Sequence, residues 1–318
     1  MPSIIDVFNG DADGICALQQ LRLAQPRESS LVTGVKRDIA LLERVTARRG
    51  DQVTVLDIAL KPNRAALDRL LNGGARVRYF DHHYPGDIPR HPGLECHIET
   101  LPDKCTCLLV DEYLGGRCRA WAVVGTFGDN LDAVARRVAA PLALAEIELG
   151  QLRELGIYIN YNGYGATVAD LHCAPDDLYR RLHPYSNPLD FIAQDPTFRV
   201  LSDGYADDMA RARGTPPTLA VGGCRLYTLP VDPWARRASG VLANELAQQS
   251  PGCAHALLTV LPTGGFLVSV RAPLTRPEGA DRLCRQFASG GGRVAAAGIN
   301  TLPAADYDRF VASFLAAF

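Results

Sequence analysis

The tripeptide Asp81-His82-His83 stands directly after an apolar run, residues 75–80, that has the composition of a buried strand. Residues 84–86, Tyr-Pro-Gly, follow it and require a turn. An acid and two imidazoles therefore lie where a strand passes into a loop, which is the usual place for ligand sites in open α/β sheets. This placement constrains the fold, because three other acidic segments of the chain share it.

The first of these segments, residues 9–14, reads Asn-Gly-Asp-Ala-Asp-Gly and separates an apolar run from a helical pattern. The second is Asp57, which ends the β-branched run 52–56, and the third is Asp129, at the glycine-punctuated end of a helix that we expect to begin at Arg119. Strand and helix patterns alternate from residue 3 to about 135, which predicts an α/β fold with a mostly parallel sheet covered on both faces.

Each acid also has a purely structural alternative. Asp57 can be a helix N-cap, and the two aspartates of residues 11–13 can be turn residues. Asp129 can be a surface carboxylate, and either histidine can be a partly buried residue satisfied by the protein. If the side chains converge instead, carboxylates with an added imidazole form a site for a divalent cation, and the imidazole shifts the preference from Mg²⁺ toward Mn²⁺.

The four acidic segments, in this order, resemble the signature motifs of the DHH phosphoesterase superfamily. That family includes single-strand-specific exonucleases, nanoRNases, 3′-phosphoadenosine-5′-phosphate phosphatases and cyclic-dinucleotide phosphodiesterases. The resemblance covers residues 1–135. In addition, residues 289–298, Ser-Gly-Gly-Gly-Arg-Val-Ala-Ala-Ala-Gly, resemble the glycine-rich loop of the associated DHHA1-type domain, and residues 265–271 resemble the strand whose terminal Arg contacts phosphate in relatives.

The resemblance implies a hydrolase that uses two Mn²⁺ (or Mg²⁺) ions, or one. It implies that Asp57 bridges the ions and that Asp81 orients His82. The implied metal ligands are Asp11, Asp13, Asp57, His82 and Asp129, and the implied catalytic residues are His83, Asp81 and Asp57. The residues expected to contact substrate are Asn9, Lys36, Arg37, Arg271, Gly291, Gly292 and Arg293.

Lys36 and Arg37 enter this set by position, because they follow another β-like run, residues 31–35; a solvated loop is the alternative. Two departures from the family pattern bear on the reaction. Asn9 and Val7 stand where many relatives carry a His, which makes a one-metal site an alternative. Arg293 replaces the His of the glycine loop, so it keeps a cation for phosphate but loses proton transfer. These departures motivate a competing hypothesis, a nucleotide-binding regulatory protein with reduced or lost turnover.

Charge and composition narrow the class of partner. The 318 residues carry a formal net charge of −2 and contain no basic run, so a small nucleotide or a short single-stranded oligonucleotide fits better than a long duplex. The nine cysteines are odd in number and scattered, which indicates reduced thiols. The first residues show no charged and then apolar signal pattern, so a cytoplasmic location is expected. No apolar stretch is long enough to span a membrane, so no membrane partner is expected. A homodimer is left open.

We predict three regions: residues 1–135 as the metal-binding phosphoesterase domain, 136–214 as a helical linker, and 215–318 as a DHHA1-like substrate-binding domain. A helix over residues 131–156 should kink or break at Pro141. Residues 158–165, rich in Tyr, Asn and Gly, indicate either an ordered loop or a surface that stacks a base. In the last region we expect strands at residues 218–221, 224–228, 256–260 and 266–270, and helices at residues 238–249 and 281–288.

Overall fold

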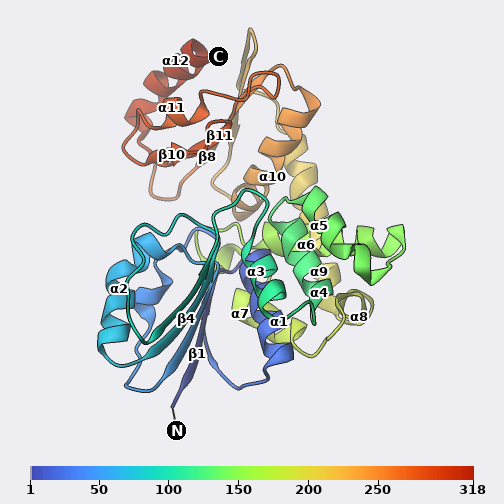
Figure 1. The fold of residues 1–318 in the computed structure, drawn as a ribbon. Coiled ribbons are helices and arrows are strands. Elements are labelled where there is room, and N and C mark those ends of the chain that lie inside the picture. Colours follow the sequence, from blue (N-terminus) through green and yellow to red (C-terminus); the bar gives the residue numbers. More distant parts are fainter. Residues whose placement is uncertain (1) are drawn as a thin grey trace. The chain divides into compact units, whose positions relative to one another are not determined.

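The computed structural model describes residues 2–318 and divides into two compact units, Met1–Asp203 and Gly204–Phe318. Each unit contains one β-sheet with helices packed on it (Figure 1). The predicted α/β class is confirmed. The helices of residues 136–203 belong to the first unit, and the boundary between the units falls within one helix, at Asp203 and Gly204.

The sheet of the first unit is fully parallel, with the strand order β2-β1-β3-β4-β5. Because the chain moves from β1 to β2 on one side and then to β3 on the other, the strand order reverses between β1 and β3. Ligands in open α/β sheets bind at such a switch point, outside the carboxyl ends of the strands. The strands are β1 (Ile4–Phe8), β2 (Ser30–Val32), β3 (Gln52–Leu56), β4 (Arg76–Asp81) and β5 (Leu94–Ile98).

Helices cover both faces of this sheet, as Figure 1 shows. One face packs against α2 (Leu60–Asn72) and the 3₁₀ turn η1 (Leu41–Arg44) through a core that includes Val7, Val55 and Leu67. The other face packs against α1 (Ala12–Ala24) and α3 (Thr106–Tyr113) through a core that includes Phe8, Leu56 and Phe80. Helix α4 (Arg119–Gly128) packs on these two helices. Burial on both faces explains why these strands are nearly continuous apolar runs.

The predicted break at Pro141 is present, because a 3₁₀ turn, η2 (Ala140–Leu142), separates α5 (Asp132–Ala139) from α6 (Glu146–Asn162). The ordered loop predicted at residues 158–165 is wrong for its first part, because residues 158–162 form the end of α6. Ile159 and Tyr161 are fully buried there, so packing overrides the turn preference of Asn and Gly. The elements that follow are η3 (Val168–Asp170), α7 (Pro175–Leu182), α8 (Pro188–Gln194) and α9 (Pro196–Arg213).

The second unit has a mixed sheet with the order β10-β11-β9-β8-β7-β6, in which only β7 and β8 run parallel. Helix α10 covers one face, and α11 and α12 cover the other. The predicted strands are all present. The helix predicted at residues 281–288 is shorter than expected, and the glycine-rich segment predicted as a loop begins with a strand, β10. The bounds are β6 (Leu219–Val221), β7 (Cys224–Leu229), α10 (Pro233–Gln249), β8 (Ala254–Val260), β9 (Phe266–Arg271), α11 (Ala280–Cys284), β10 (Gly290–Gly292), β11 (Ala296–Leu302), η4 (Ala304–Asp306) and α12 (Tyr307–Ala317).

Across residues 2–318, no helix combines the length and the apolar character needed to cross a membrane.

Candidate metal centre

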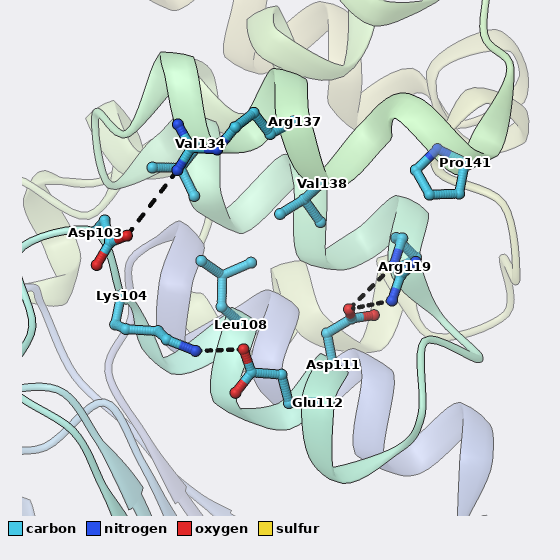
Figure 2. Close-up of a pocket in the computed structure, with 10 residues that line it drawn as sticks. All are labelled: Asp103, Lys104, Leu108, Asp111, Glu112, Arg119, Val134, Arg137, Val138 and Pro141. Carbon is cyan, nitrogen blue, oxygen red and sulfur yellow. Dashed lines mark hydrogen bonds and ion pairs between the residues drawn. The ribbon is translucent and has the colours of Figure 1, made fainter.

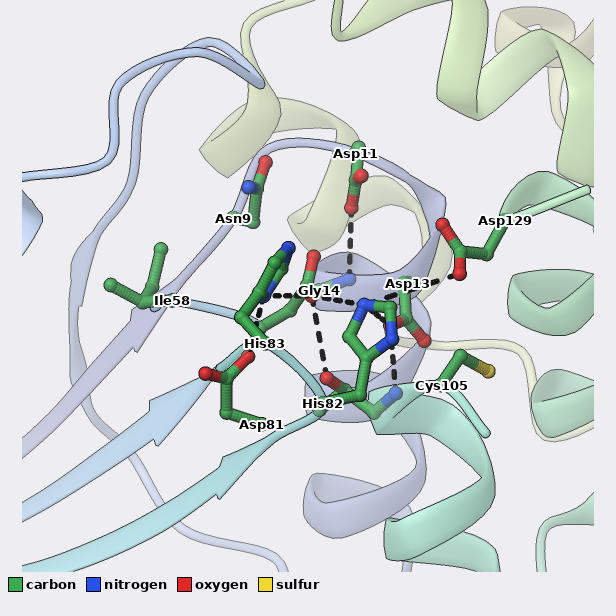
Figure 3. A network of polar contacts seen from close by, with 12 residues as sticks. Asn9, Asp11, Asp13, Gly14, Ile58, Asp81, His82, His83, Cys105 and Asp129 are labelled. Atoms are coloured by element: carbon green, nitrogen blue, oxygen red, sulfur yellow. Dashed lines mark hydrogen bonds and ion pairs between the residues drawn. The ribbon is translucent and has the colours of Figure 1, made fainter. Parts of the chain in front are cut away.

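The acidic and histidine residues singled out in the first unit follow the carboxyl ends of adjacent parallel strands. Asn9 and Asp11 follow β1, Asp57 follows β3, and the segment 81–83 ends and follows β4. Since β1, β3 and β4 are neighbours in the sheet, these side chains gather at one edge (Figure 3). The convergence on which the sequence argument depended is therefore present at the switch point of the sheet.

The N-terminus of α3 holds the carboxylate of Asp13. The backbone N–H of Thr106 donates to its Oδ2 at 2.8 Å, and the backbone N–H of Cys107 donates to its Oδ1 at 2.7 Å. Both donors are among the N–H groups that a helix leaves without an intrahelical partner, and the helix dipole favours a negative charge at this end. The two backbone donors thereby fix the orientation of the buried Asp13 carboxylate.

His82 presents its Nε2 atom to three carboxylates. Its Nδ1 lies 3.1 Å from the carbonyl oxygen of Lys104, a bond in which only the imidazole N–H can donate. This bond leaves Nε2 as the ligand atom, the arrangement common to histidines that bind metals. Nε2 lies 3.5 Å from Oδ1 of Asp57, 3.8 Å from Oδ2 of Asp13 and 4.0 Å from Oδ2 of Asp129.

Asp81 contacts His83 and not His82, which corrects the expectation that it orients His82. Nδ1 of His83 donates to Oδ1 of Asp81 at 2.7 Å. The contact lies where β4 ends, because Asp81 is the last residue of that strand and the chain bends at His83. Asp81 is completely buried, whereas the side chain of His83 is 47% exposed. The pair therefore joins a fixed carboxylate to an imidazole that solvent or a ligand can reach.

Asp57 adopts an unusual backbone conformation, with φ at +57°. Left-handed conformations of non-glycine residues are costly and cluster at functional sites. The carboxylate accepts a hydrogen bond from Oγ1 of Thr106 at 3.3 Å. Burial, followed by the charges of Asp11 and Asp13, raises the pKa of the Asp57 carboxyl well above its usual range, although His82 opposes this. The buried negative charge is thus under-compensated by the protein.

The same electrostatic field acts on His82 and Asp129. Burial lowers the pKa of His82, but its hydrogen bond to Asp57 and the charges of the surrounding carboxylates outweigh burial and raise the pKa to about 10. Burial, together with the charge of Asp13, raises the pKa of Asp129 to about 6 against the effects of Lys36 and His82. In the metal-free protein, the protonated imidazole of His82 carries the positive charge that balances the surrounding carboxylates.

Two glycines of α4 bring Asp129 into this cluster. A Cβ at Gly125 would lie 2.2 Å from Sγ of Cys107 in α3, and a Cβ at Gly128 would lie 2.3 Å from Cβ of Ala12 in α1. The backbone of α4 therefore approaches both helices more closely than any other residue type allows. Asp129 is the next residue after this contact and ends the helix.

Asp11 faces a lysine. Its Oδ2 lies 2.5 Å from Nζ of Lys36, which follows β2, and its Oδ1 accepts the backbone N–H of Gly14 at 3.1 Å. Burial opposes ionisation of the carboxyl, but the charge of Lys36 outweighs it and lowers the pKa of Asp11. Nδ2 of Asn9 donates to the carbonyl oxygen of Lys36 at 3.3 Å, while Arg37 lies exposed on the same loop.

The predicted substrate contacts of the C-terminal region lie in the second unit. Arg271 ends β9 opposite Ala296, and the backbone N–H of Arg293 donates to the carbonyl oxygen of Ala296. Both arginines are thus at one end of the sheet. Gly291 and Gly292 belong to β10, which pairs with β11. Contact of these four residues with a substrate stays a prediction.

The donor set fits a divalent cation. The described residues contain two groups of three in which the ligand atoms lie within 4.8 Å of one another. One group is Asp57, His82 and His83, and the other is Asp13, His82 and Asp129. Ligand atoms about 2.1 Å from a common ion are about 3 to 4 Å apart, so the spacings around His82 need only small adjustments. Oδ2 of Asp81 and Oδ1 of Asn9 are buried without a hydrogen-bond partner among the described residues. Carboxylate oxygens with one or two imidazole nitrogens suit Mn²⁺.

Sequence reasoning missed several residues that shape the centre. The carbonyl of Lys104 orients His82, and Thr106 contacts both Asp13 and Asp57. Asn160, in α6, accepts a hydrogen bond from Nζ of Lys36 at 2.8 Å. The start of a helix at Thr106 could have indicated an N-terminus that binds an anion. The carbonyl of Lys104 and the distant residue Asn160 leave no local pattern in the sequence.

A pocket of about 350 Å³ lies between α3, α4 and α5 of the same unit (Figure 2). Each of its basic side chains is ion-paired within the pocket: Lys104 with Glu112, Arg119 with Asp111, and Arg137 with Asp103. Because the cations are neutralised by neighbouring acids, this pocket has no excess positive charge for a phosphate.

No protein-family model matches the chain, and no curated protein matches it by sequence. Solved structures do match. A DHH domain described as a member of a family of ribosomal proteins has a TM-score of 0.71 and 13% identity, covering 99% of this chain and 86% of that one. The exonuclease RecJ bound to manganese has a TM-score of 0.63 and 18% identity, covering 99% and 89%. The pGpG-specific phosphodiesterase PggH from Vibrio cholerae has a TM-score of 0.54 and 14% identity, covering 99% and 100%. The chain therefore has the fold of the DHH superfamily, as its four acidic motifs indicated.

Proposed function

We propose that this chain is a divalent-metal-dependent phosphoesterase that hydrolyses phosphodiester or phosphomonoester bonds of short oligonucleotides or small nucleotides. The observation that carries the proposal is the convergence of Asp13, Asp57, His82, His83 and Asp129 into two groups of ligand atoms at the switch point of the sheet. Two structural neighbours support it, since one is an exonuclease bound to manganese and the other is a pGpG-specific phosphodiesterase.

In this proposal Asp13, His82 and Asp129 hold the cation, and Asp57 lies beside it as a further carboxylate ligand. When bound, such an ion supplies a nucleophilic water near neutral pH and charge neutralisation for the phosphate. The protein contributes rigid ligands: Asp13 is fixed by two backbone N–H groups, and His82 is fixed by the carbonyl of Lys104. Rigid, pre-oriented ligands are what keeps a metal site selective and tight.

His83 is the residue best suited to exchange a proton with the substrate. Its Nδ1–H is held by the buried carboxylate of Asp81, so its Nε2 is the atom available to a ligand. Its imidazole is half exposed, unlike the buried aspartates around it. We assign it to the phosphate or to the leaving oxygen, with Asp81 as its positioning residue.

We propose the substrate class on the basis of the net charge and of the structural neighbours. The net charge of −2 disfavours long nucleic acids, whose binding depends on many phosphate contacts. Lys36 and Arg37 in the first unit, and Arg271 and Arg293 in the second, are the cations that we assign to phosphate, with the backbone of Gly291 and Gly292 as further donors. A dinucleotide such as the pGpG of the neighbour PggH is of the expected size.

One observation favours the competing function, a nucleotide-binding protein with reduced turnover. Asp11 is neutralised by Lys36, and the preceding side chain from β1, Asn9, is uncharged. Such a centre has less negative charge with which to attract cations. Tight nucleotide binding without metal-dependent product release would favour this second function over hydrolysis.

A panel assay tests the proposal. Purified protein with Mn²⁺ is incubated with linear dinucleotides, cyclic dinucleotides, 3′-phosphoadenosine-5′-phosphate and a long single strand, and products are separated by chromatography. We expect cleavage of at least one short substrate and a loss of about 100-fold or more for Asp57→Asn. The matched control is Asp68→Asn, an exposed aspartate of α2 paired with Arg64, which should retain full activity. Failure to cleave any substrate, or equal activity of both variants, refutes the proposal.

A further inference from the structure

Lys36 is the one cation whose ammonium group lies within the carboxylate cluster, as far as residues 2–318 describe it, and its side chain is firmly held. Nζ is 2.5 Å from Oδ2 of Asp11, 2.8 Å from Oδ1 of Asn160 and 5.4 Å from the centroid of the Tyr164 ring. The backbone is held as well, because the N–H of Lys36 donates to the carbonyl oxygen of Gly163 at 2.8 Å. The carboxylate, the amide oxygen and the aromatic face together form a binding site for the lysine ammonium.

Asp11 lies beside Asp57 but belongs to neither group of ligand atoms among the described residues. Both groups contain His82. An imidazole Nε2 has one lone pair and binds one ion at a time. The two groups therefore overlap at a single nitrogen, which suits one ion with alternative or additional carboxylate ligands better than two separate ions.

The surroundings of Asp11 oppose a second ion there. Its Oδ2 pairs with the lysine ammonium, and its Oδ1 accepts the N–H of Gly14. Asn9, the adjacent side chain from β1, is neutral and donates its amide to the carbonyl of Lys36. A divalent ion at Asp11 would therefore be placed against an ammonium at contact distance, and like charges so close repel strongly in a buried site.

We propose that the centre of this chain holds a single divalent ion, at Asp13, Asp57, His82 and Asp129, and that the Lys36 ammonium takes the place of a second cation beside Asp11. This inference rests on the proposed metal-dependent function and deepens it. An ammonium has three N–H donors, of which Asp11 and Asn160 use two, so the third is placed to donate to a phosphate oxygen of the substrate.

The test counts bound Mn²⁺ and needs no substrate. Protein is titrated with Mn²⁺, and the free ion is measured by its electron paramagnetic resonance signal. We expect one Mn²⁺ per chain for the wild type and for Lys36→Arg, which keeps the charge, and two for Lys36→Ala, which exposes the carboxylate of Asp11. Lys61→Ala is the control, because Lys61 contacts the ring of Tyr84 and lies outside both ligand groups.

A wild type that binds two Mn²⁺, or a Lys36→Ala variant that still binds one, overturns the inference but leaves a metal-dependent phosphoesterase intact. A wild type that binds none overturns the proposed function as well. If Lys36→Ala does not fold, as judged by circular dichroism, Asp11→Asn gives a second measurement. It should still bind one Mn²⁺ with an affinity within about tenfold of the wild type, because Asp11 is a partner of Lys36 and not a ligand. A hundredfold loss of affinity in Asp11→Asn overturns the inference.

Discussion

Because α4 packs closely against α1 and α6 at Gly128, we predict that Gly128→Ala lowers both the stability of the protein and its affinity for Mn²⁺. A Cβ at this position would lie 2.3 Å from Cβ of Ala12 and 2.9 Å from the carbonyl oxygen of Gly156. Carbon atoms in contact prefer a separation of about 3.5 to 4.0 Å, so Gly128→Ala must push the helices apart by roughly 1 Å or more. The obstacles are a Cβ and a backbone carbonyl, neither of which can rotate away.

The displacement should be measurable in both stability and metal binding. Overpacking a tight contact costs about 1–3 kcal/mol in the free energy of unfolding. Asp129 is the next residue, and its Oδ2 lies 4.0 Å from Nε2 of His82. Metal–ligand distances tolerate shifts of only about 0.2 Å, so moving Asp129 by about 1 Å should remove it as a ligand and weaken Mn²⁺ binding by about 10- to 100-fold.

Gly150→Ala is the matched control. Gly150 is also a helical glycine, in α6, but a Cβ there meets nothing within 4 Å. Relief of the glycine penalty in a helix should stabilise this variant by up to about 1 kcal/mol and leave Mn²⁺ affinity unchanged. The assays are urea unfolding followed by circular dichroism, and Mn²⁺ titration of the folded protein. Equal stability and equal Mn²⁺ affinity of the two alanine variants would refute the packing argument.

Three further outcomes are expected. Arg22→Met removes the only charged partner recorded for the buried carboxylate of Asp6 among residues 2–318 and leaves it with the hydroxyl of Ser29. This should lower the free energy of unfolding by about 3–5 kcal/mol, measured by urea unfolding through the fluorescence of the buried Trp121 in a Trp234→Phe background; a loss below about 1 kcal/mol contradicts this. The pKa of His82, raised to about 10 by the surrounding carboxylates, keeps the imidazole charged below that pH, so Mn²⁺ must displace a proton in order to bind. The affinity for Mn²⁺ should therefore rise about tenfold per pH unit from about pH 6.5 to 8.5, and an affinity that does not change with pH contradicts this prediction. Asp81→Asn should lower turnover about 10- to 100-fold with unchanged Mn²⁺ affinity, and a parallel loss of Mn²⁺ would mean that Asp81 is itself a ligand.

The gathering of the acidic segments was predictable because it follows from topology. Parallel strands end at a common edge of their sheet, so an acid after each of several strands must arrive at the same place. The sequence shows each strand and each acid, and hence Asp13, Asp57 and His82 could be grouped before any coordinates. The identity of the strands that neighbour one another was the remaining step, and the order β2-β1-β3-β4 supplies it.

The partners that fix each side chain were not predictable in the same way. Asp81 pairs with His83 rather than His82, and the orientation of His82 comes from the carbonyl of Lys104, 22 residues further on. Every residue has a carbonyl group, so none of them has a sequence signature. Asn160 joins Lys36 from α6, across 124 positions of the chain, and such a contact depends on the packing of a whole helix.

The glycines before Asp129 show why a motif can be recognised for one reason and required for another. In the sequence, Gly125 and Gly128 indicate the end of a helix before an acidic turn, because glycine is common at helix ends and in turns. In the structure both lie inside α4, and their missing side chains allow α1, α3 and α6 to approach. Gly156 of α6 completes the contact, because a Cβ there would lie 2.9 Å from the backbone nitrogen of Gly128. A glycine pair three residues apart is ambiguous between a turn and a helix crossing, and only the matching glycine on the partner helix resolves it. Asp129 is therefore positioned by the close approach of α4 to its neighbouring helices, which the missing side chains of Gly125, Gly128 and Gly156 allow. This close approach depends on the packing of several helices and not on the motif alone.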